Sequence, residues 1–159
     1  YKEKPSRAQK QPALNSVWFA RMQDTYKVIP FTNGNAALTQ RCMLSSGFAG
    51  FRSSDDVTFP FLFCTINSKD FHASKDRFCT GATQRSLTNE GMSRIQIIVP
   101  PQELVEKFGE AVHSNIDLML TLQCQNKVLR RTRQLLLPKL ISTELDVSKL
   151  DIDVPAEVA

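Results

Sequence analysis

Residues 101–137 constrain the fold more than any other segment, because they contain a single glycine, Gly109, and no proline after Pro101. Pro101 suits the first position of a helix, where its missing N–H is no loss. Acidic residues come early in the segment and arginines come late, which is the charge order that a helix dipole favours. We therefore predict a helix about 55 Å long at 1.5 Å per residue, which Pro138 stops or kinks.

One side of this helix predicts a second helix beside it. Alternating steps of three and four residues reach eleven positions, of which eight are apolar, as in the heptad seam of a coiled coil. The seam residues that we expect to pair are Val105, Phe108, Val112, Asn115, Met119, Leu122, Asn126, Leu129 and Leu136. The alternative is an ordinary amphipathic helix packed on its own domain, since Ile116 and neighbouring leucines widen the apolar face.

Charge along the helix predicts the direction of the pairing. Residues 101–120 hold four acids and one lysine, whereas residues 121–140 hold five bases and no acid. Two such helices would oppose unlike charges only if they ran antiparallel. We expect the second helix to come from a second copy of the chain or from a second repeat in a longer polypeptide.

Composition places the chain among globular proteins, with 159 residues, 42% hydrophobic residues and 23% charged residues. No apolar run is long enough for a transmembrane helix, and no secretory signal is present, so we expect a cytoplasmic protein without membrane contact. The four cysteines show no C-x-x-C spacing, so we expect reduced thiols and no metal site. Residues 1–100 carry a net charge of +6, which is compatible with nucleic-acid binding.

The remaining sequence predicts an α+β fold, with a small mixed domain ahead of the long helix. We divide the chain into a polar tail or the remnant of a truncated domain over 1–16, a domain over 17–100, the helix over 101–141 and a C-terminal tail over 142–159. Within the domain, Val57 to Ile66 could form a buried strand or a short helix with Pro60 in its first turn. Ile95 to Val99 is the clearest strand, because it is rich in β-branched residues.

Several segments, in this order, resemble the specificity subunit of type I restriction–modification systems. Leu129 to Val147 (LRRTRQLLLPKLISTELDV) is similar to the C-terminal conserved region of that family, although Thr143 stands where the family usually has glycine. Gly81 to Gln84, followed by Arg94 to Pro101, is similar to the segment that closes the family's target recognition domain. Two weaker similarities are Ala20–Arg21–Met22 and Ser45–Ser46–Gly47–Phe48.

The resemblance implies a non-catalytic module that reads one half of a split target in double-stranded DNA. It implies that two recognition domains are separated by their paired antiparallel helices, and that modification (methyltransferase) subunits and a restriction/motor subunit dock on this framework. It also implies that S-adenosylmethionine, ATP and Mg²⁺ serve those partner subunits and that this chain binds no cofactor. The chain would be the C-terminal half of a subunit or a natural half-subunit that forms a homodimer.

Donors near turns of the domain are the candidates for DNA contact, since arginine matches guanine, and asparagine or glutamine matches adenine. The predicted DNA-binding residues are Arg21, Lys27, Asn35, Arg41, Arg52, Lys75, Arg77, Thr83, Gln84 and Arg85. The last three follow Gly81, and a loop that begins with glycine can approach a groove closely. The same three residues could equally form a structural turn that braces the domain against its helix.

Catalytic motifs are not evident in the sequence. It contains no phosphate-binding loop and no nucleophile elbow. His72 with Cys64 or Cys79 could be a nucleophile–base pair, but we favour a surface histidine and small core cysteines. The alternative to DNA recognition is an oligomerisation adaptor that acts through its coiled-coil helix.

Overall fold

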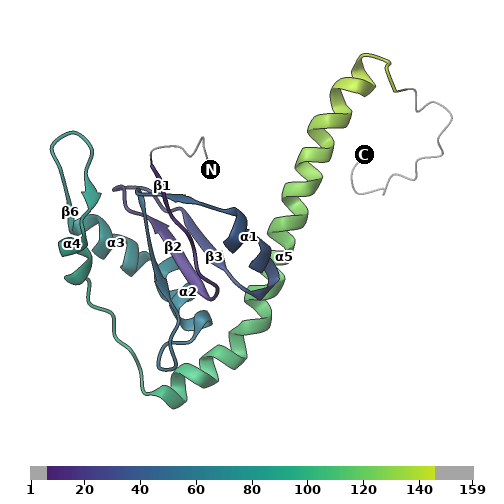
Figure 1. Cartoon of the computed structure of the whole chain (residues 1–159). Helices are drawn as coiled ribbons and strands as arrows, with labels where there is room; N and C mark the ends of the chain where they lie inside the picture. The colour runs from purple at the N-terminus through teal and green to yellow at the C-terminus, as the bar shows by residue number, and fades with distance from the viewer. Residues whose placement is uncertain (1–6, 146–159) are drawn as a thin grey trace. The chain divides into compact units, whose positions relative to one another are not determined.

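A computed structural model describes residues 7–145 of the chain (Figure 1). The chain divides into two compact units, one up to Ile116 and one from Asp117 onward. The elements in chain order are β1 (Ala8–Lys10), β2 (Ser16–Ala20), β3 (Val28–Phe31), η1 (Asn33–Asn35), α1 (Ala36–Arg41), β4 (Leu44–Ser45), β5 (Phe48–Arg52), α2 (Phe59–Asn67), α3 (Lys69–Arg77), β6 (Cys79–Thr80), β7 (Ser86–Leu87), α4 (Asn89–Ser93) and α5 (Gln102–Ile141).

Strand β2 is the centre of the first unit. It pairs antiparallel with β3 on one side and with β5 on the other, so that the sheet has the order β3-β2-β5. Val17 and Phe19 of β2 are fully buried. Helix α2 packs on β2 and β3 (Figure 1). Phe71 of α3 meets the Phe19 ring edge-on at 5.0 Å. The two remaining sheets are the antiparallel pairs β1-β4 and β6-β7.

Close contact between β2 and β5 requires a glycine at position 50. A Cβ atom on Gly50 would lie 2.4 Å from the Trp18 ring, which is nearer than such atoms approach. Trp18 and Gly50 are cross-strand partners, so the Trp18 ring occupies the space that a side chain at position 50 would need. Replacement of Gly50 by any larger residue would therefore displace the Trp18 ring.

The ambiguous run Val57 to Ile66 forms helix α2, with Pro60 at its start. Its apolar side chains Leu62, Phe63 and Ile66 are buried, which the three- and four-residue spacing of a helix allows on one face. Ser68 ends α2 and begins α3, and its side-chain oxygen accepts a hydrogen bond from the Phe71 backbone N–H. This cap satisfies one of the free amides at the start of α3.

Two predictions for individual segments are wrong. The polar tail over 1–16 contains strand β1, whose Ala8 lies opposite Ser45 of β4. Ile95 to Val99 forms no strand, and Ile98 is 90% exposed. A strand needs a neighbouring backbone for its hydrogen bonds, and no described strand is hydrogen-bonded to this segment.

The long helix is confirmed as α5, which has 40 residues. Pro138 lies inside α5 and does not stop it, since three more helical residues follow it. Because proline has no N–H, the Gln134 carbonyl loses the hydrogen bond that residue 138 would otherwise donate in the helix. The tail over 142–159 lies outside the described residues from 146 onward, and so do residues 1–6 of the N-terminal tail.

The two portions of α5 differ in burial. Val105, Gly109 and Ile116 are buried in the first unit, as expected of an amphipathic helix on its own domain. From Thr121 to Leu145 the large apolar side chains are exposed, including Leu129 at 65%, whereas Met119 and Leu120 are half-buried. The small sheets and helices, followed by the long helix α5, confirm the predicted α+β fold class. None of the described helices is apolar over a length that could cross a membrane.

Candidate nucleic-acid interface

Three segments far apart in sequence meet at one groove of the first unit. Arg21 at the end of β2 donates its backbone N–H to the Gly47 carbonyl at 2.9 Å and accepts from the Leu87 N–H at 2.8 Å. Gln23 donates to the Arg85 carbonyl at 3.0 Å, and Met22 forms a β-bridge with Ser86. Backbone hydrogen bonds therefore join β2, the β4–β5 turn and the β6–β7 hairpin.

The groove between these segments has a volume of about 690 Å³ and is rich in hydrogen-bonding groups. Its polar side chains are Arg7, Arg21, Ser45, Ser46, Gln84, Ser86, Thr88 and Asn89. Two of these are arginines, and none of the described lining residues is Asp or Glu. Arginines with hydroxyl and amide groups are the side chains that most often contact DNA phosphates and base edges.

Arg21 is fixed within this groove. Its Nε donates to the Leu87 carbonyl at 2.6 Å, and its Nη2 donates to Asn89 Oδ1 at 2.7 Å. A guanidinium has five N–H donors, so these two bonds leave others for a ligand. The side chain is only half-buried, so a duplex in the groove could reach it.

Two lysines lie next to Phe48, which lines the groove. Lys10 Nζ donates to the Phe48 carbonyl at 2.7 Å, and Lys27 Nζ lies 5.7 Å from the centre of the Phe48 ring. Burial lowers the pKa of Lys10, and the positive charge of Arg21 lowers this pKa further. Lys10 contacts Phe48 and Arg21 contacts the adjacent Gly47, so both cations contribute to one positive region, which would attract a polyanion.

The loop of the β6–β7 hairpin holds Gly81, Thr83, Gln84 and Arg85. Gly81 has a φ of 131°, and a Cβ atom there would lie 2.6 Å from the Gln84 carbonyl, so the turn requires glycine. Arg85 braces the hairpin, since its Nη2 donates to the Cys79 carbonyl at 2.9 Å. Thr83 and Gln84 are exposed, and Gln84 lines the groove.

The structure brings together only part of the predicted DNA-binding set. Arg21 and Gln84 line the groove, and Lys27 lies near it beside Phe48. Arg52 lies opposite Ser16, at the other end of β2 from Arg21. Arg41 ends α1 and Arg77 ends α3, and neither lines the groove.

One predicted DNA contact does not fit the structure. Lys75 is fully buried, so the prediction that it contacts DNA is wrong. Asn35 is half-buried and holds the turn after β3, because its Oδ1 accepts from the Thr32 N–H and its Nδ2 donates to the Pro30 carbonyl. Val105 is likewise wrong as a helix-pairing residue, since it is buried against its own domain.

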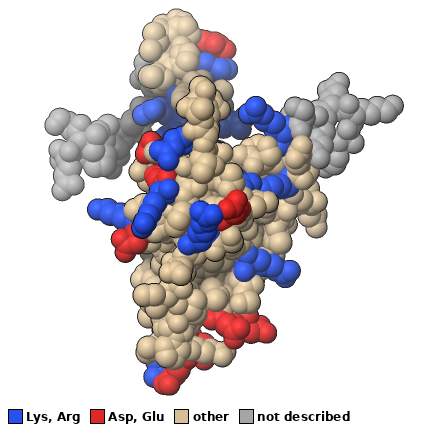
Figure 2. All heavy atoms as spheres, turned by 90° about the vertical axis from the view of Figure 1, so that its left-hand side faces the viewer, with Lys and Arg blue, Asp and Glu red and all other residues tan. Residues whose placement is uncertain are grey.

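Sequence reasoning missed several residues of this interface. Arg7 and Lys10 fall in the segment that we interpreted as a tail, and Asn89 follows the hairpin. Ser45 and Ser46 belong to a motif that we noted only for its resemblance. The surface in Figure 2 shows Lys and Arg side chains gathered over the middle of one face, with a few acidic residues among them.

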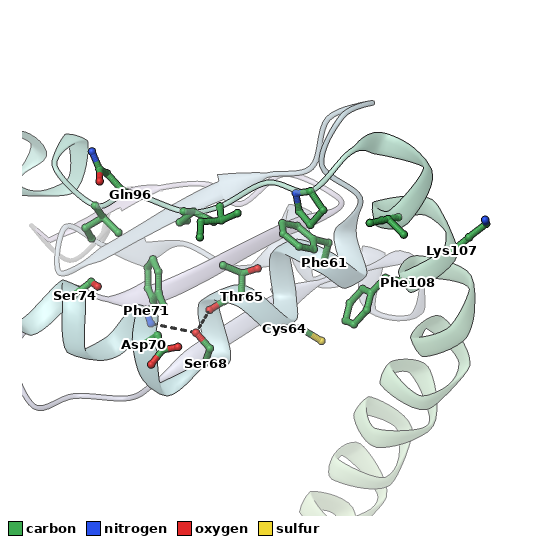
Figure 3. Close-up of a pocket in the computed structure, with 15 residues that line it drawn as sticks. Phe61, Cys64, Thr65, Ser68, Asp70, Phe71, Ser74, Gln96, Lys107 and Phe108 are labelled. Atoms are coloured by element: carbon green, nitrogen blue, oxygen red, sulfur yellow. Dashed lines mark hydrogen bonds between the residues drawn. The ribbon is translucent and has the colours of Figure 1, made fainter.

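A second hollow of about 840 Å³ in the same unit is mostly apolar (Figure 3). Phe61, Phe71 and Phe108 line it together with the extended segment 95–98. Phe61 meets Phe108 edge-on at 6.3 Å, which joins α2 to the first turns of α5. The segment that we predicted as a strand therefore forms part of the wall of this hollow.

The cysteines and histidine that could form a nucleophile–base pair are not arranged as one. Burial raises the pKa of the Cys64 thiol and of the Cys79 thiol, which keeps both protonated and weakly nucleophilic at neutral pH. His72 is buried rather than on the surface, and its Nδ1 has no hydrogen-bond partner within residues 7–145. Cys79 Sγ instead donates to the Lys75 carbonyl at 3.3 Å.

Comparison with known proteins gives one similarity and no match to any protein-family model. The chain is 29% identical over 92 residues, which are 57% of its length, to the specificity subunit of the type I restriction enzyme HindI from Haemophilus influenzae. The matched region spans 20% of that subunit. This similarity agrees with the family that the sequence motifs resemble.

Proposed function

We propose that this chain is a DNA-recognition module of a type I restriction–modification specificity subunit. The observation that carries the proposal is the meeting of three motif segments around one polar groove that holds arginines and lacks described carboxylates. The similarity to the HindI specificity subunit supports it. The chain reads one half of a bipartite site in double-stranded DNA, in the cytoplasm.

The chemistry of the groove suits this role. Arg21 carries donors for guanine, Gln84 carries a donor and an acceptor for adenine, and the serine hydroxyls suit phosphate oxygens. Lys10 and Lys27 extend the positive region beside the groove. The chain itself performs no catalysis and binds no cofactor. S-adenosylmethionine, ATP and Mg²⁺ act in the modification and restriction/motor subunits that assemble with it.

In this proposal α5 pairs antiparallel with the same helix of a second copy or with a second specificity half. Its exposed leucines support the pairing, because covering one such side chain contributes about 1.5–3 kcal/mol. The unlike charges of its two halves favour the antiparallel direction. The paired helices then separate two recognition domains and scaffold the modification subunits.

The groove can be tested with the chain assembled with its modification subunits. A duplex is first enriched from a randomised pool, and its affinity is measured by fluorescence anisotropy across a range of salt concentrations. We expect the logarithm of the binding constant to fall with the logarithm of salt, by about 0.9 per phosphate contacted. Arg21→Ala and Gln84→Ala should each weaken binding by about 5- to 100-fold, the range for lost base contacts.

Arg52→Ala is the comparison variant, because Arg52 lies at the opposite end of β2 from Arg21. It should bind the enriched duplex much more tightly than Arg21→Ala does. Thermal unfolding of each variant separates lost contacts from lost folding. Equal affinities for all four proteins, or affinity that does not depend on salt, would contradict the proposed groove.

The adaptor function remains a second candidate, because the exposed apolar side chains of α5 would serve it equally well. Leu122→Glu with Leu129→Glu should convert an associated chain into a monomer in sedimentation experiments, since both positions lie in the seam. If the wild-type complex binds no duplex while this pairing is real, the adaptor function is the correct one.

A further inference from the structure

The most deeply buried charge of the first unit lies on α3. Lys75 is 0% exposed, and its Nζ donates to the Met22 carbonyl at 2.9 Å and to the Thr25 carbonyl at 2.8 Å. The Asp76 carboxylate lies 3.1 Å from the same nitrogen. A buried ammonium is costly unless it is paired and hydrogen-bonded, so a lysine here indicates a task that an apolar residue could not perform.

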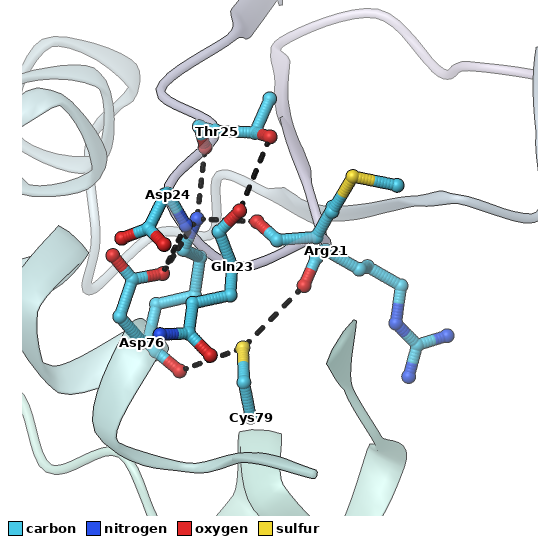
Figure 4. Close-up of polar contacts among 8 residues, drawn as sticks. Arg21, Gln23, Asp24, Thr25, Asp76 and Cys79 are labelled. Atoms are coloured by element: carbon cyan, nitrogen blue, oxygen red, sulfur yellow. Dashed lines mark hydrogen bonds and ion pairs between the residues drawn. The ribbon is translucent and has the colours of Figure 1, made fainter. Parts of the chain in front are cut away.

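The contacts of Lys75 connect α3 to one loop of the domain. Both carbonyls belong to the loop between β2 and β3, residues 21–27, which begins at Arg21 in the groove (Figure 4). Asp76 accepts a hydrogen bond from the Asp24 backbone N–H at 3.2 Å. Asp24 has a φ of 57°, a left-handed conformation that this bond helps to hold. Helix α3 therefore fixes the loop backbone at three points.

The loop presents apolar side chains on the surface in defined positions. Met22 is 48% exposed and Tyr26 is 62% exposed. The Tyr26 ring meets His72 edge-on at 4.9 Å, and Lys75 Nζ lies 5.6 Å from the ring centre. Met22 lines the basic groove, and Tyr26 is an exposed aromatic on the same loop. Such side chains suit contact with a thymine methyl or insertion at a base step.

Resting on the proposed function, we propose that the β2–β3 loop is a sequence-reading element and that Lys75 is a positioning residue that holds it. Met22 and Tyr26 contact the bases, and Lys75 acts through the loop without touching DNA. The sequence predicts that Lys75 contacts DNA, whereas in this proposal Lys75 is buried and positions the loop. Lys27 differs from Lys75 because it is exposed on the loop and can contact DNA directly.

The test compares the enriched duplex with a scrambled duplex, using the full chain with its modification subunits. Lys75→Met should lower affinity for the enriched duplex by about ten-fold or more, the cost of one misread base pair. Affinity for the scrambled duplex and the salt slope should stay unchanged, because Lys75 meets no phosphate. Lys69→Met, an exposed lysine at the start of the same helix, is the matched control and should change neither.

Tyr26→Ala keeps the proposal testable if Lys75→Met fails to fold, because an exposed side chain contributes little to stability. It should cause the same selective loss for the enriched duplex. Its effect should shrink in the Lys75→Met background, because both changes act through one loop. Lys27→Ala, by contrast, should weaken both duplexes and reduce the salt slope by about 0.9 for one lost phosphate contact.

The outcomes separate the two proposals. If the wild-type complex binds no duplex, the proposed function fails and this inference fails with it. If wild type binds but Tyr26→Ala and Lys75→Met bind equally well, only the loop assignment is overturned. A smaller salt slope for Lys75→Met would show that Lys75 contacts phosphate, and would also overturn it.

Discussion

His72 is a buried histidine whose surroundings disfavour its charged form. Burial lowers its pKa, and the neighbouring Lys75 charge lowers it further, whereas Asp76 acts in the opposite direction. Its ring is held between Phe71 and Tyr26 by edge-on contacts. The neutral imidazole is therefore the form that fits the folded domain.

A pH dependence of stability follows from His72. Because its folded-state pKa lies below the unfolded value of 6.5, the unfolded chain takes up the proton more readily as pH falls. The contribution of His72 to stability is thus present above pH 6.5 and is lost as pH falls through the folded-state pKa. Urea unfolding of His72→Phe should show a smaller loss of stability between pH 7 and pH 5 than wild type. Equal losses would refute the assignment.

Single residues also show where prediction from sequence succeeds. Arg21 and Gln84 were identified because donors near turns are accessible, and both line the groove. Lys75 was misassigned because lysine is rarely buried. A signal was available, since Lys75 follows the buried Phe71 by four residues and so shares its helix face. Predicting its partners would have required knowing which loop crosses α3.

At the scale of elements, local preference determined less than the presence of neighbours. Ile95 to Val99 has the residues of a strand, yet it forms none, because no described strand is hydrogen-bonded to it. Its residues 95–98 instead line a mostly apolar hollow. The segment 1–16 was too polar to suggest a strand, and β1 exists because β4 pairs with it. The helix α5 was predictable because its pattern is local and lacks glycine and proline over most of its length.

The direction of helix pairing in α5 can be tested with engineered cysteines. Val112 and Leu129 are seam positions equally distant from the boundary between the acidic and basic halves, at residues 120 and 121. An antiparallel pair places them opposite each other, whereas a parallel pair places each opposite itself. Mixing Val112→Cys chains with Leu129→Cys chains, both with Cys124→Ser, should give mainly mixed disulfide dimers under oxidation.

Each single variant oxidised alone is the control for that experiment. An antiparallel pair should leave both controls largely monomeric on a non-reducing gel. Efficient dimers in the separate controls would instead indicate a parallel pair. The native Cys42 and Cys64 are half-buried, so the same gel of the Cys124→Ser chain measures their background.

At the scale of the whole molecule, the buried core and the exposed seam belong to different parts of the chain. The buried apolar side chains of the described residues lie at or before Ile116, where the first unit ends. The net charge differs similarly, at +6 for residues 1–100 and −2 for the remainder. Folding and association should therefore be separable.

A chain that ends at Ile116 tests this separation. It should unfold cooperatively, within about 5 °C of the full chain, because it retains the core that supplies most of the burial. It should sediment as a monomer, since it lacks Leu122 and Leu129. Loss of cooperative unfolding, followed by circular dichroism, would show that the first unit depends on the rest of α5.

The bonds that join the three segments of the groove link main-chain atoms, as between the Arg21 amide and the Gly47 carbonyl. Every amino acid except proline offers the same amide, so the frame is indifferent to most of the side chains it displays. Mutation could thus exchange the groups at positions such as 22, 46 and 84 while the frame persists. A protein built in this way can acquire a new recognition sequence without acquiring a new architecture.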